Sequence, residues 1–378
     1  MQAGVFLKGD EMKIQAAVLV EPKQPFAIET VDLEGPRAGE VLVKLSAAGV
    51  CHSDWHLATG ATRHPLPVVP GHEGAGVIAD TGPGVAHLKP GMHVALSWAP
   101  SCGRCFYCLH DRPSLCGAYT APVWAGTLLD GTPRLSWRGA PLYHFCALAC
   151  FAEYAVVPQE CCVPMPHEVP LEIAALIGCA VTTGVGAVLH SARVPAGASV
   201  AVFGAGGVGL SALVGAQLVG ATPIIAVDRM EEKLALAKNF GASDTVVAGP
   251  HAAEEIQKLT QGRGADFVIE AIGSPAVQEQ CLHAARPGGT VVLAGLAPMG
   301  SGTNFPGALI TRQEKIVMGC YYGSAHPPRD FPALAGFYRS GQLPLEKLVS
   351  SRWKLDQINE AYKEMLEGSG ARGVVIFE

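Results

Sequence analysis

Residues 200–209 constrain the fold of this chain more than any other segment. Four apolar residues, Val200–Phe203, precede Gly204-Ala205-Gly206-Gly207-Val208-Gly209, and an apolar stretch of helical length follows. A strand, a glycine-rich turn and a helix in this order predict a parallel sheet that binds a dinucleotide. Gly204 permits the tight turn, Gly206 lets a pyrophosphate approach the backbone, and Gly209 lets helix and strand pack closely. The N–H groups at the start of the helix, with Gly207 and Val208, would face the phosphates.

Asp228 supplies the acidic partner that such a turn needs. It lies at the end of the next apolar run, nineteen residues after Gly209. A carboxylate at this place accepts hydrogen bonds from the adenosine ribose 2′-OH and repels a 2′-phosphate, which favours NAD over NADP. Arg229, the next residue, weakens this preference because a guanidinium can bind a phosphate. The alternative is a strand–helix–strand unit in which the glycines serve packing alone.

The pattern of apolar segments changes about halfway along the chain. Short apolar runs between Gly/Pro turns predict strands near residues 14–20, 40–47 and 76–80. Later residues predict parallel strands at 199–203, 223–227, 265–270 and 290–294, with helices at 207–219, 230–240 and 252–261. This alternation predicts an α/β fold class with a doubly wound parallel sheet behind a β-rich region. A length of 378 residues suggests two domains, or three.

Composition excludes several kinds of partner. The 27 basic and 33 acidic residues are spread along the chain and give a net charge of -6, so no basic run points to nucleic acid or a membrane surface. Residues 199–227 carry no charge, but their glycines and Pro223 favour strand, helix and strand over a membrane span. Residues 1–13 lack an apolar run of signal-peptide length. We therefore expect a cytoplasmic protein that starts at Met1 or Met12.

Four of the twelve cysteines lie close together, at Cys102, Cys105, Cys108 and Cys116. They offer four thiolates in one short loop, which is a complete set for tetrahedral zinc. An iron–sulfur cluster usually has a shorter last spacing followed by a proline. Two disulfides would need an oxidising compartment. The spacing therefore predicts a structural zinc with no open position for a substrate.

A second set of metal-ligand residues comes from three separate segments. Cys51 and His72 lie near the β-rich region, and Cys179 lies before the parallel sheet. Taken singly, each has an ordinary alternative, because buried cysteines act as small apolar residues and loop histidines are common. Together, the three form a zinc set with an open fourth position, which is typical of a catalytic zinc.

These motifs, in this order, resemble the zinc-dependent medium-chain alcohol dehydrogenases, in particular their long-loop branch. The resemblance runs from about Met12 to Glu378 and rests on the segment around Cys51, Gly71-His72-Glu73-Gly74, the four-cysteine loop, Gly178-Cys179 and the glycine-rich turn. It implies a GroES-like catalytic domain over residues 1–180 and 324–378 and a Rossmann NAD-binding domain over residues 181–323, with the active site in the cleft between them. It also implies two zinc ions per chain and reversible hydride transfer between a primary alcohol or aldehyde and NAD.

The resemblance assigns roles to individual residues. Cys51, His72 and Cys179 would be the catalytic zinc ligands, with Glu73 close behind the metal. Ser53 and His56 would relay the proton, and Asp54 would orient His72. Besides the glycine-rich turn, Asp228 and Arg229, the cofactor would contact His52, Thr183, Lys233 and Arg372. Asp54 as a solvated loop carboxylate and His56 as a surface histidine remain the ordinary alternatives.

The resemblance also implies a substrate class and an assembly. Trp98, Phe145, Cys146 and Tyr321 match pocket positions of the family, and such an apolar cleft with aromatic walls suits medium-chain, terpenoid or benzylic alcohols. Trp98 could equally be an ordinary core residue. Residues 116–154 are long, as in the dimeric members, so a homodimer is expected.

Three alternative functions stay open. The enzyme could oxidise the formaldehyde adduct of a thiol, since His52 matches that branch, although no basic cluster for the carboxylates of such an adduct is found. It could also keep NAD tightly bound and need an external acceptor. A non-catalytic zinc- and nucleotide-binding protein is the alternative from another class. The presence of all three zinc ligands together with Ser53 and His56 favours an enzyme.

Overall fold

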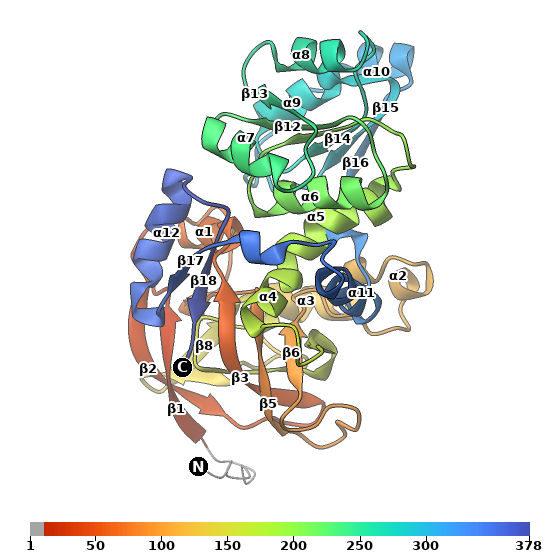
Figure 1. Ribbon diagram of the computed structural model, residues 1–378. Coiled ribbons are helices and arrows are strands. Elements are labelled where there is room, and N and C mark those ends of the chain that lie inside the picture. Colours follow the sequence, from red (N-terminus) through yellow and green to blue (C-terminus); the bar gives the residue numbers. More distant parts are fainter. Residues whose placement is uncertain (1–10) are drawn as a thin grey trace. The chain divides into compact units, whose positions relative to one another are not determined.

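The structure is a computed structural model that describes residues 11–378 (Figure 1). The expectations about residues 1–10, including the absence of a signal segment and a start at Met1, lie outside the described residues. The described chain divides into two compact units. The first unit comprises the residues up to Cys179 together with His326–Glu378, and the second comprises Ala180–Ala325.

The first unit is built on two mainly antiparallel sheets. One has the strand order β1-β2-β7-β8-β4, and the other has the order β10-β6-β5-β3-β18-β17, with β9 also paired to β3. The strands are β1 (Glu11–Val18), β2 (Ala27–Glu34), β3 (Glu40–Gly49), β4 (Val68–Val69), β5 (Gly74–Thr81), β6 (His93–Leu96), β7 (Leu135–Trp137), β8 (Ala140–His144), β9 (Tyr154–Pro158), β10 (Cys162–Pro164), β17 (Val349–Trp353) and β18 (Arg372–Ile376). The helices are α1 (His52–Ala58), α2 (Phe106–Leu109), α3 (Gly117–Ala125), α4 (Leu171–Leu176), α11 (Pro327–Arg339) and α12 (Ile358–Glu367).

Strand β3 shows why this unit has a large core. Its apolar residues Val41, Val43 and Leu45 point to one face, and all are 1% exposed or less. Lys44, between them, is exposed on the other face. β3 pairs with β5, β9 and β18, so the last described strand of the chain lies beside one of the first.

The second unit contains a six-stranded parallel sheet with the order β13-β12-β11-β14-β15-β16. The strands are β11 (Val200–Phe203), β12 (Ile224–Asp228), β13 (Asp244–Val247), β14 (Ala265–Glu270), β15 (Ala285–Leu293) and β16 (Ile316–Gly319). The helices are α5 (Thr182–Gly186), α6 (Gly207–Leu218), α7 (Glu231–Lys238), α8 (Ala252–Leu259), α9 (Pro275–Ala284) and α10 (Gly307–Gln313). Figure 1 shows α5 and α6 on one side of this sheet and α8, α9 and α10 on the other. The predicted α/β class with a doubly wound parallel sheet is therefore confirmed.

The largest departure from the expected elements is the start of β15. A strand was expected at 290–294, whereas β15 begins at Ala285. Its pairing with β14 passes from Ala265↔Ala285 to Phe267↔Thr290, so the intervening residues bulge out of the ladder. These residues include Pro287, Gly288 and Gly289, which in a sequence indicate a turn rather than a strand.

Residues 199–227 form β11, α6 and most of β12, as expected for a strand, a helix and a second strand rather than a membrane span. A different segment, Leu171–Ala192, forms one continuous helix of 22 residues that is long and apolar enough to cross a membrane. Because 89% of its most apolar window is buried inside the protein, its hydropathy is that of a core helix.

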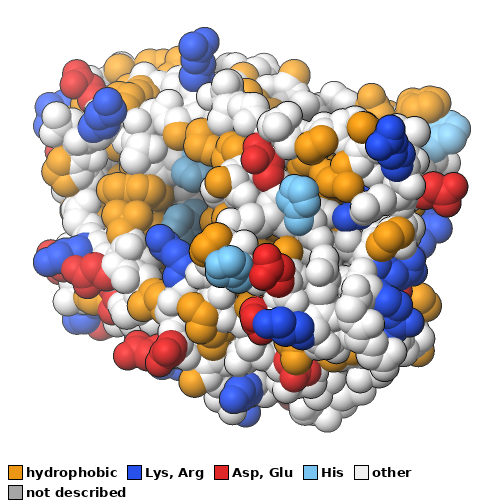
Figure 2. All heavy atoms as spheres, turned by 90° about the horizontal axis from the view of Figure 1, so that it is seen from above, with side chains coloured by type: hydrophobic (Ala, Val, Ile, Leu, Met, Phe, Trp, Pro, Cys, Tyr) orange, Lys and Arg blue, Asp and Glu red, His pale blue; other side chains and the backbone are white. Residues whose placement is uncertain are grey.

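On the face shown in Figure 2, Lys and Arg side chains are interspersed with Asp and Glu side chains.

A buried ion pair ties strand β3 to the segment before β7. Arg134 is 1% exposed, and its Nε and Nη2 donate hydrogen bonds of 2.9 and 2.5 Å to the carboxylate of Glu40. Nη2 also donates to Asp130 at 2.7 Å. Glu40 is itself 7% exposed. Removal of one partner would leave the other as an uncompensated buried charge.

We therefore expect Arg134→Ala to lower the free energy of unfolding by about 3–5 kcal/mol, because the Glu40 carboxylate would stay buried without its partner. The matched control is Arg138→Ala, whose side chain is 71% exposed and should contribute about 1 kcal/mol or less. Urea denaturation of both variants measures the difference. Equal losses in the two variants would contradict the role of the buried pair.

Candidate active site

Four ionisable side chains meet at one buried point of the first unit. One ligand atom from each of Cys51, His72, Glu73 and Cys179 lies within 4.8 Å of the others, and all four residues are buried. Cys51 is the residue before α1, and His72 and Glu73 lie between β4 and β5. Cys179 lies in the π-helical turn Ile177–Val181, a type of helix irregularity that often occurs at functional sites. The fold thus brings together the three ligands predicted from separate segments.

Asp54 fixes the loop that carries His72. One carboxylate oxygen, Oδ1, accepts a hydrogen bond of 2.8 Å from the backbone N–H of Gly71. The other, Oδ2, lies 3.0 Å from Nδ1 of His72. Gly71 has a φ of +92°, and a Cβ there would lie 2.6 Å from the backbone nitrogen of Phe151. Asp54 is fully buried, so it is not a solvated loop carboxylate.

The donor set fits zinc. Nε2 of His72 is buried and has no hydrogen-bond partner among residues 11–378. A hydrogen bond with Cys179 lowers the pKa of Cys51, against the effect of burial and with help from Arg372 and His72, so this thiol ionises readily. As the donor of that hydrogen bond, Cys179 has a raised pKa. Two sulfurs and one imidazole around one point are a common ligand set for a catalytic zinc.

Glu73 and Arg372 form an ion pair that sequence analysis did not reveal. Glu73 is fully buried, and Nη2 of Arg372 donates to its Oε1. Burial raises the pKa of Glu73 to about 7, although Arg372 acts in the opposite direction. A Cβ on Gly49 would lie 2.1 Å from Oε2 of Glu73, so this glycine leaves room for the carboxylate. The guanidinium of Arg372 lies against Glu73, and its expected contact with the cofactor phosphates stays a prediction.

The expected relay residues both lie on α1. Sγ of Cys51 is 3.8 Å from Oγ of Ser53, so the hydroxyl borders the ligand group. His56 is half-buried, and burial lowers its pKa, so its imidazole is neutral at pH 7. His52, at the start of the same helix, is exposed.

Two of the expected pocket residues surround His72. The rings of Trp98 and Phe145 contact the imidazole edge-on, with centroids 6.2 and 5.7 Å from its own. Cys146, next to Phe145, is buried and has a φ of 56°. Tyr321 belongs to the second unit and is 40% exposed. The metal group is therefore walled by aromatic side chains of the first unit.

The four clustered cysteines form a separate group in the same unit. One sulfur from each of Cys102, Cys105, Cys108 and Cys116 lies within 4.8 Å of the others, so the set can hold one metal ion. Sγ of Cys105 lies 3.5 Å from that of Cys108 and 3.8 Å from that of Cys116. A hydrogen bond from the backbone N–H of Cys108 is the main reason why the pKa of Cys105 falls to about 6. A thiolate is the form that binds zinc.

The glycine-rich turn of the second unit has the expected geometry. Gly204 has a φ of +97°, and a Cβ on Gly209 would lie 1.7 Å from the carbonyl oxygen of Gly204, so neither position accepts a side chain. The space around a Cβ at Gly206 is open to 4 Å, as the approach of a pyrophosphate requires. Helix α6 begins at Gly207 and continues through Val208.

Asp228 lies at the end of β12, beside β11, with its carboxylate at the turn. Its Oδ2 accepts a hydrogen bond of 2.7 Å from the backbone N–H of Ala205, and its Oδ1 accepts one of 3.1 Å from that of Met230. Arg229 is exposed and Lys233 is half-exposed on α7. Thr183 is buried on α5, where a Cβ on Gly184 would lie 2.2 Å from the carbonyl oxygen of Val208. Asp228 thus lies at the turn before α6, and the helix that carries Thr183 packs closely against the start of α6.

Comparison with known proteins agrees with this geometry. Residues 37–167 match the alcohol dehydrogenase GroES-like domain, and residues 207–340 match the zinc-binding dehydrogenase family. The chain is 39% identical over 370 residues to putative alcohol dehydrogenase D of Mycobacterium tuberculosis, covering 97% of this chain and 100% of the relative. It is 40% identical over 368 residues to the NDMA-dependent alcohol dehydrogenase of Amycolatopsis methanolica, covering 97% and 99%. It is 36% identical to the S-(hydroxymethyl)glutathione dehydrogenase of Paracoccus denitrificans, covering 97% and 100%.

Solved structures show the same similarity. The alcohol dehydrogenase zinc-binding domain protein from Burkholderia ambifaria has a TM-score of 0.93 and 35% identity, covering 98% of this chain and 100% of that one. The benzyl alcohol dehydrogenase from Acinetobacter calcoaceticus has a TM-score of 0.91 and 32% identity, covering 97% and 100%. The chain therefore belongs to the zinc-dependent medium-chain alcohol dehydrogenase family, as an NAD(H)-dependent oxidoreductase that interconverts alcohols and aldehydes.

Proposed function

We propose that Cys51, His72 and Cys179 hold a catalytic zinc, with Glu73 behind it, and that Cys102, Cys105, Cys108 and Cys116 hold a structural zinc. The observation that carries this proposal is the convergence of two thiols and one imidazole at a buried point beside aromatic walls. Three protein ligands leave one position for the substrate oxygen, whereas four cysteines leave none.

The residues around the first site prepare it for alcohol chemistry. Zinc bound there supplies a Lewis acid that lowers the pKa of a substrate alcohol, and NAD supplies the hydride acceptor. Asp54 holds the His72 ring by its Nδ1 side, which leaves Nε2 for the metal. The Ser53 hydroxyl would accept the alcohol proton while its own proton passes, through the cofactor ribose, to His56, whose imidazole can take it because burial keeps it neutral. The aromatic walls exclude water and orient the substrate.

The cofactor proposal rests on the second unit. The turn Gly204, Gly206, Gly207, Val208 and Gly209 would bind the pyrophosphate, and Asp228 would bind the adenosine ribose. Thr183, Arg229 and Lys233 lie on neighbouring elements of that unit and complete the set. We keep His52 and Arg372 as cofactor contacts from the first unit. Asp228 favours NAD over NADP.

We further propose a primary medium-chain, terpenoid or benzylic alcohol as substrate. Trp98, Phe145 and Cys146 support it, because two aromatic rings beside His72 suit an apolar carbon skeleton. The similarity to a benzyl alcohol dehydrogenase agrees with this class. Tyr321 is proposed as a further pocket residue from the family position that it matches.

A second candidate is an enzyme that needs an external acceptor or a thiol adduct. It is favoured by the names of two full-length relatives, an NDMA-dependent alcohol dehydrogenase and an S-(hydroxymethyl)glutathione dehydrogenase. In the first case NAD would stay bound through the cycle. In the second, formaldehyde would react as its thiol adduct.

We also propose a cytoplasmic homodimer. Strand β16 lies at the edge of the parallel sheet, and its first residue, Ile316, is 53% exposed. An exposed apolar edge strand can pair with another strand. A second copy of the same strand would cover it.

A steady-state screen tests the function. We expect NADH formation with hexanol, geraniol or benzyl alcohol, and more slowly with ethanol, without added thiol or acceptor. Loss of a residue that only hydrogen-bonds a metal ligand typically lowers activity by roughly 10–100-fold. Cys51→Ala removes a ligand itself, so we expect a larger fall in turnover, while NAD binding stays intact. Equal turnover in this variant would refute the assignment of the open site. Activity only with glutathione and formaldehyde, or only with an artificial acceptor, would favour the second candidate.

Asp228→Ala tests the cofactor preference. We expect the dissociation constant for NAD to rise about tenfold or more, because charge-assisted hydrogen bonds to the ribose are lost. The constant for NADP should fall or stay unchanged, since a repulsive charge is removed. Titration calorimetry measures both, with Glu231→Ala on the same unit as control. Equal weakening of both cofactors would show that Asp228 serves only the turn, through its bonds to Ala205 and Met230.

Light scattering tests the assembly. We expect the purified protein to have the mass of two chains, and Val317→Pro in the middle of β16 to shift it to one chain, because proline removes a ladder N–H from an edge strand. A wild-type mass of one or four chains would refute the homodimer.

A further inference from the structure

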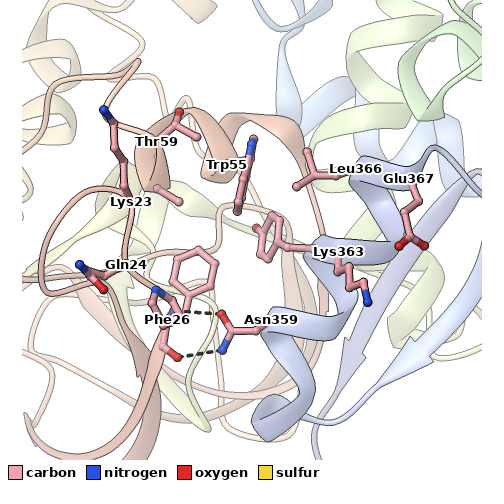
Figure 3. A pocket seen from close by; sticks show the side chains of 12 residues that line it. Lys23, Gln24, Phe26, Trp55, Thr59, Asn359, Lys363, Leu366 and Glu367 are labelled. Atoms are coloured by element: carbon pink, nitrogen blue, oxygen red, sulfur yellow. Dashed lines mark hydrogen bonds between the residues drawn. The ribbon is translucent and has the colours of Figure 1, made fainter.

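A pocket of about 610 Å³ lies in the first unit, and its lining residues include none of those assigned to the metal sites or the proton relay. It is formed by the turn between β1 and β2, by the second half of α1 and by α12. Figure 3 shows the side chains of Phe26 and Trp55 between those of Lys23 and Leu366. The volume lies within the range of sites for small organic ligands.

Three aromatic rings form the floor and one wall. The ring of Tyr362 lies 5.1 Å from that of Phe26 and is stacked on that of Trp55 at 5.8 Å with an interplanar angle of 24°. Phe26 and Tyr362 are 5% and 1% exposed, whereas Trp55 is half-buried and offers part of its surface. Leu366 is 46% exposed at the rim. Such a surface favours a planar aromatic ligand, because rings gain area burial and offset stacking.

The pocket is preformed by hydrogen bonds. The side chain of Asn359 accepts a bond of 3.0 Å from the N–H of Phe26 and donates one of 3.0 Å to its carbonyl oxygen (Figure 3). The N–H of Lys23 donates to the carbonyl oxygen of Ala58 at the end of α1 over 2.6 Å. Lys23 has a φ of 67°, a conformation that L residues rarely adopt without such support. The turn, α1 and α12 are therefore fixed to one another before any ligand arrives.

The rim carries more positive than negative charge. Lys23 and Lys363 are exposed, and within residues 11–378 neither forms an ion pair. Glu367 is the one acidic residue among the twelve that line the pocket. Two free ammonium groups at the edge of an aromatic floor complement a ligand that has a ring and an anionic group.

We propose that this pocket binds a planar aromatic monocarboxylate, whose ring stacks on Trp55 over Phe26 and Tyr362 and whose carboxylate faces Lys23 or Lys363. None of the lining residues is among those proposed to contact NAD or the alcohol, so we expect the pocket to bind its ligand whether or not NAD is present. The ligand would touch Trp55, which lies between Asp54 and His56 on α1. Its binding would therefore act on the helix that carries the proposed relay residues.

Titration calorimetry with 1-naphthoate, in the presence and absence of saturating NAD, tests the proposal. We expect a dissociation constant below about 1 mM in both conditions. Trp55→Ala should raise it about tenfold, because a stacked ring is lost. The matched control is Trp98→Ala, beside His72, which should leave it unchanged. Weaker binding by Trp98→Ala together with unchanged binding by Trp55→Ala would place the carboxylate at the metal group and overturn the proposal. Loss of binding in the presence of NAD would also overturn it.

A charge test covers the case in which Trp55→Ala fails to fold. The double variant Lys23→Glu/Lys363→Glu changes only exposed side chains, and we expect it to raise the dissociation constant at least about fivefold and to weaken its dependence on salt. Lys347→Glu, an exposed lysine of the same unit, is the control. An unchanged constant in the double variant, or no binding by the wild-type protein, would overturn the proposal.

Discussion

The burial of ionisable groups around Cys51 and His72 is the constraint on which the rest of the site depends. Burial of charge costs free energy unless partners compensate it. Here the compensation is internal, because Asp54 lies against His72, Arg372 against Glu73 and Cys179 against Cys51. A bound cation would further offset the cost of burial, because the two thiolates and the Glu73 carboxylate are negatively charged when they are deprotonated.

Backbone geometry makes that cluster available to a ligand. Cys51 precedes a helix, His72 follows a glycine in the left-handed region, and Cys179 lies in a π-helical turn. These places are a helix end, a turn and a helix irregularity, and from them the three side chains converge on one point. In the second unit, the glycine-rich turn leaves the start of α6 without a side-chain cap. The backbone N–H groups there are therefore available to a phosphate.

Much of this arrangement could be predicted from the sequence, for physical reasons. Spacing alone identified the Cys102–Cys116 group, because four ligands in one loop need no tertiary information. The strand–turn–helix at Gly204 was likewise local. The ion pair between Arg372 and Glu73 joins residues 299 positions apart, and nothing in the sequence indicates which arginine meets that carboxylate. The bulged start of β15 was missed because Pro287 and the two glycines after it resemble a turn, and only pairing with β14 makes this segment part of a strand.

The central claim is that this chain holds two zinc ions with different coordination. Anomalous diffraction on either side of the zinc absorption edge, from crystals of the protein as purified, tests it most directly. We expect two peaks per chain, one among Cys51, His72 and Cys179 with a non-protein fourth ligand, and one among Cys102, Cys105, Cys108 and Cys116 with none. A single peak in the four-cysteine group, or a first site closed by four protein ligands, would contradict it.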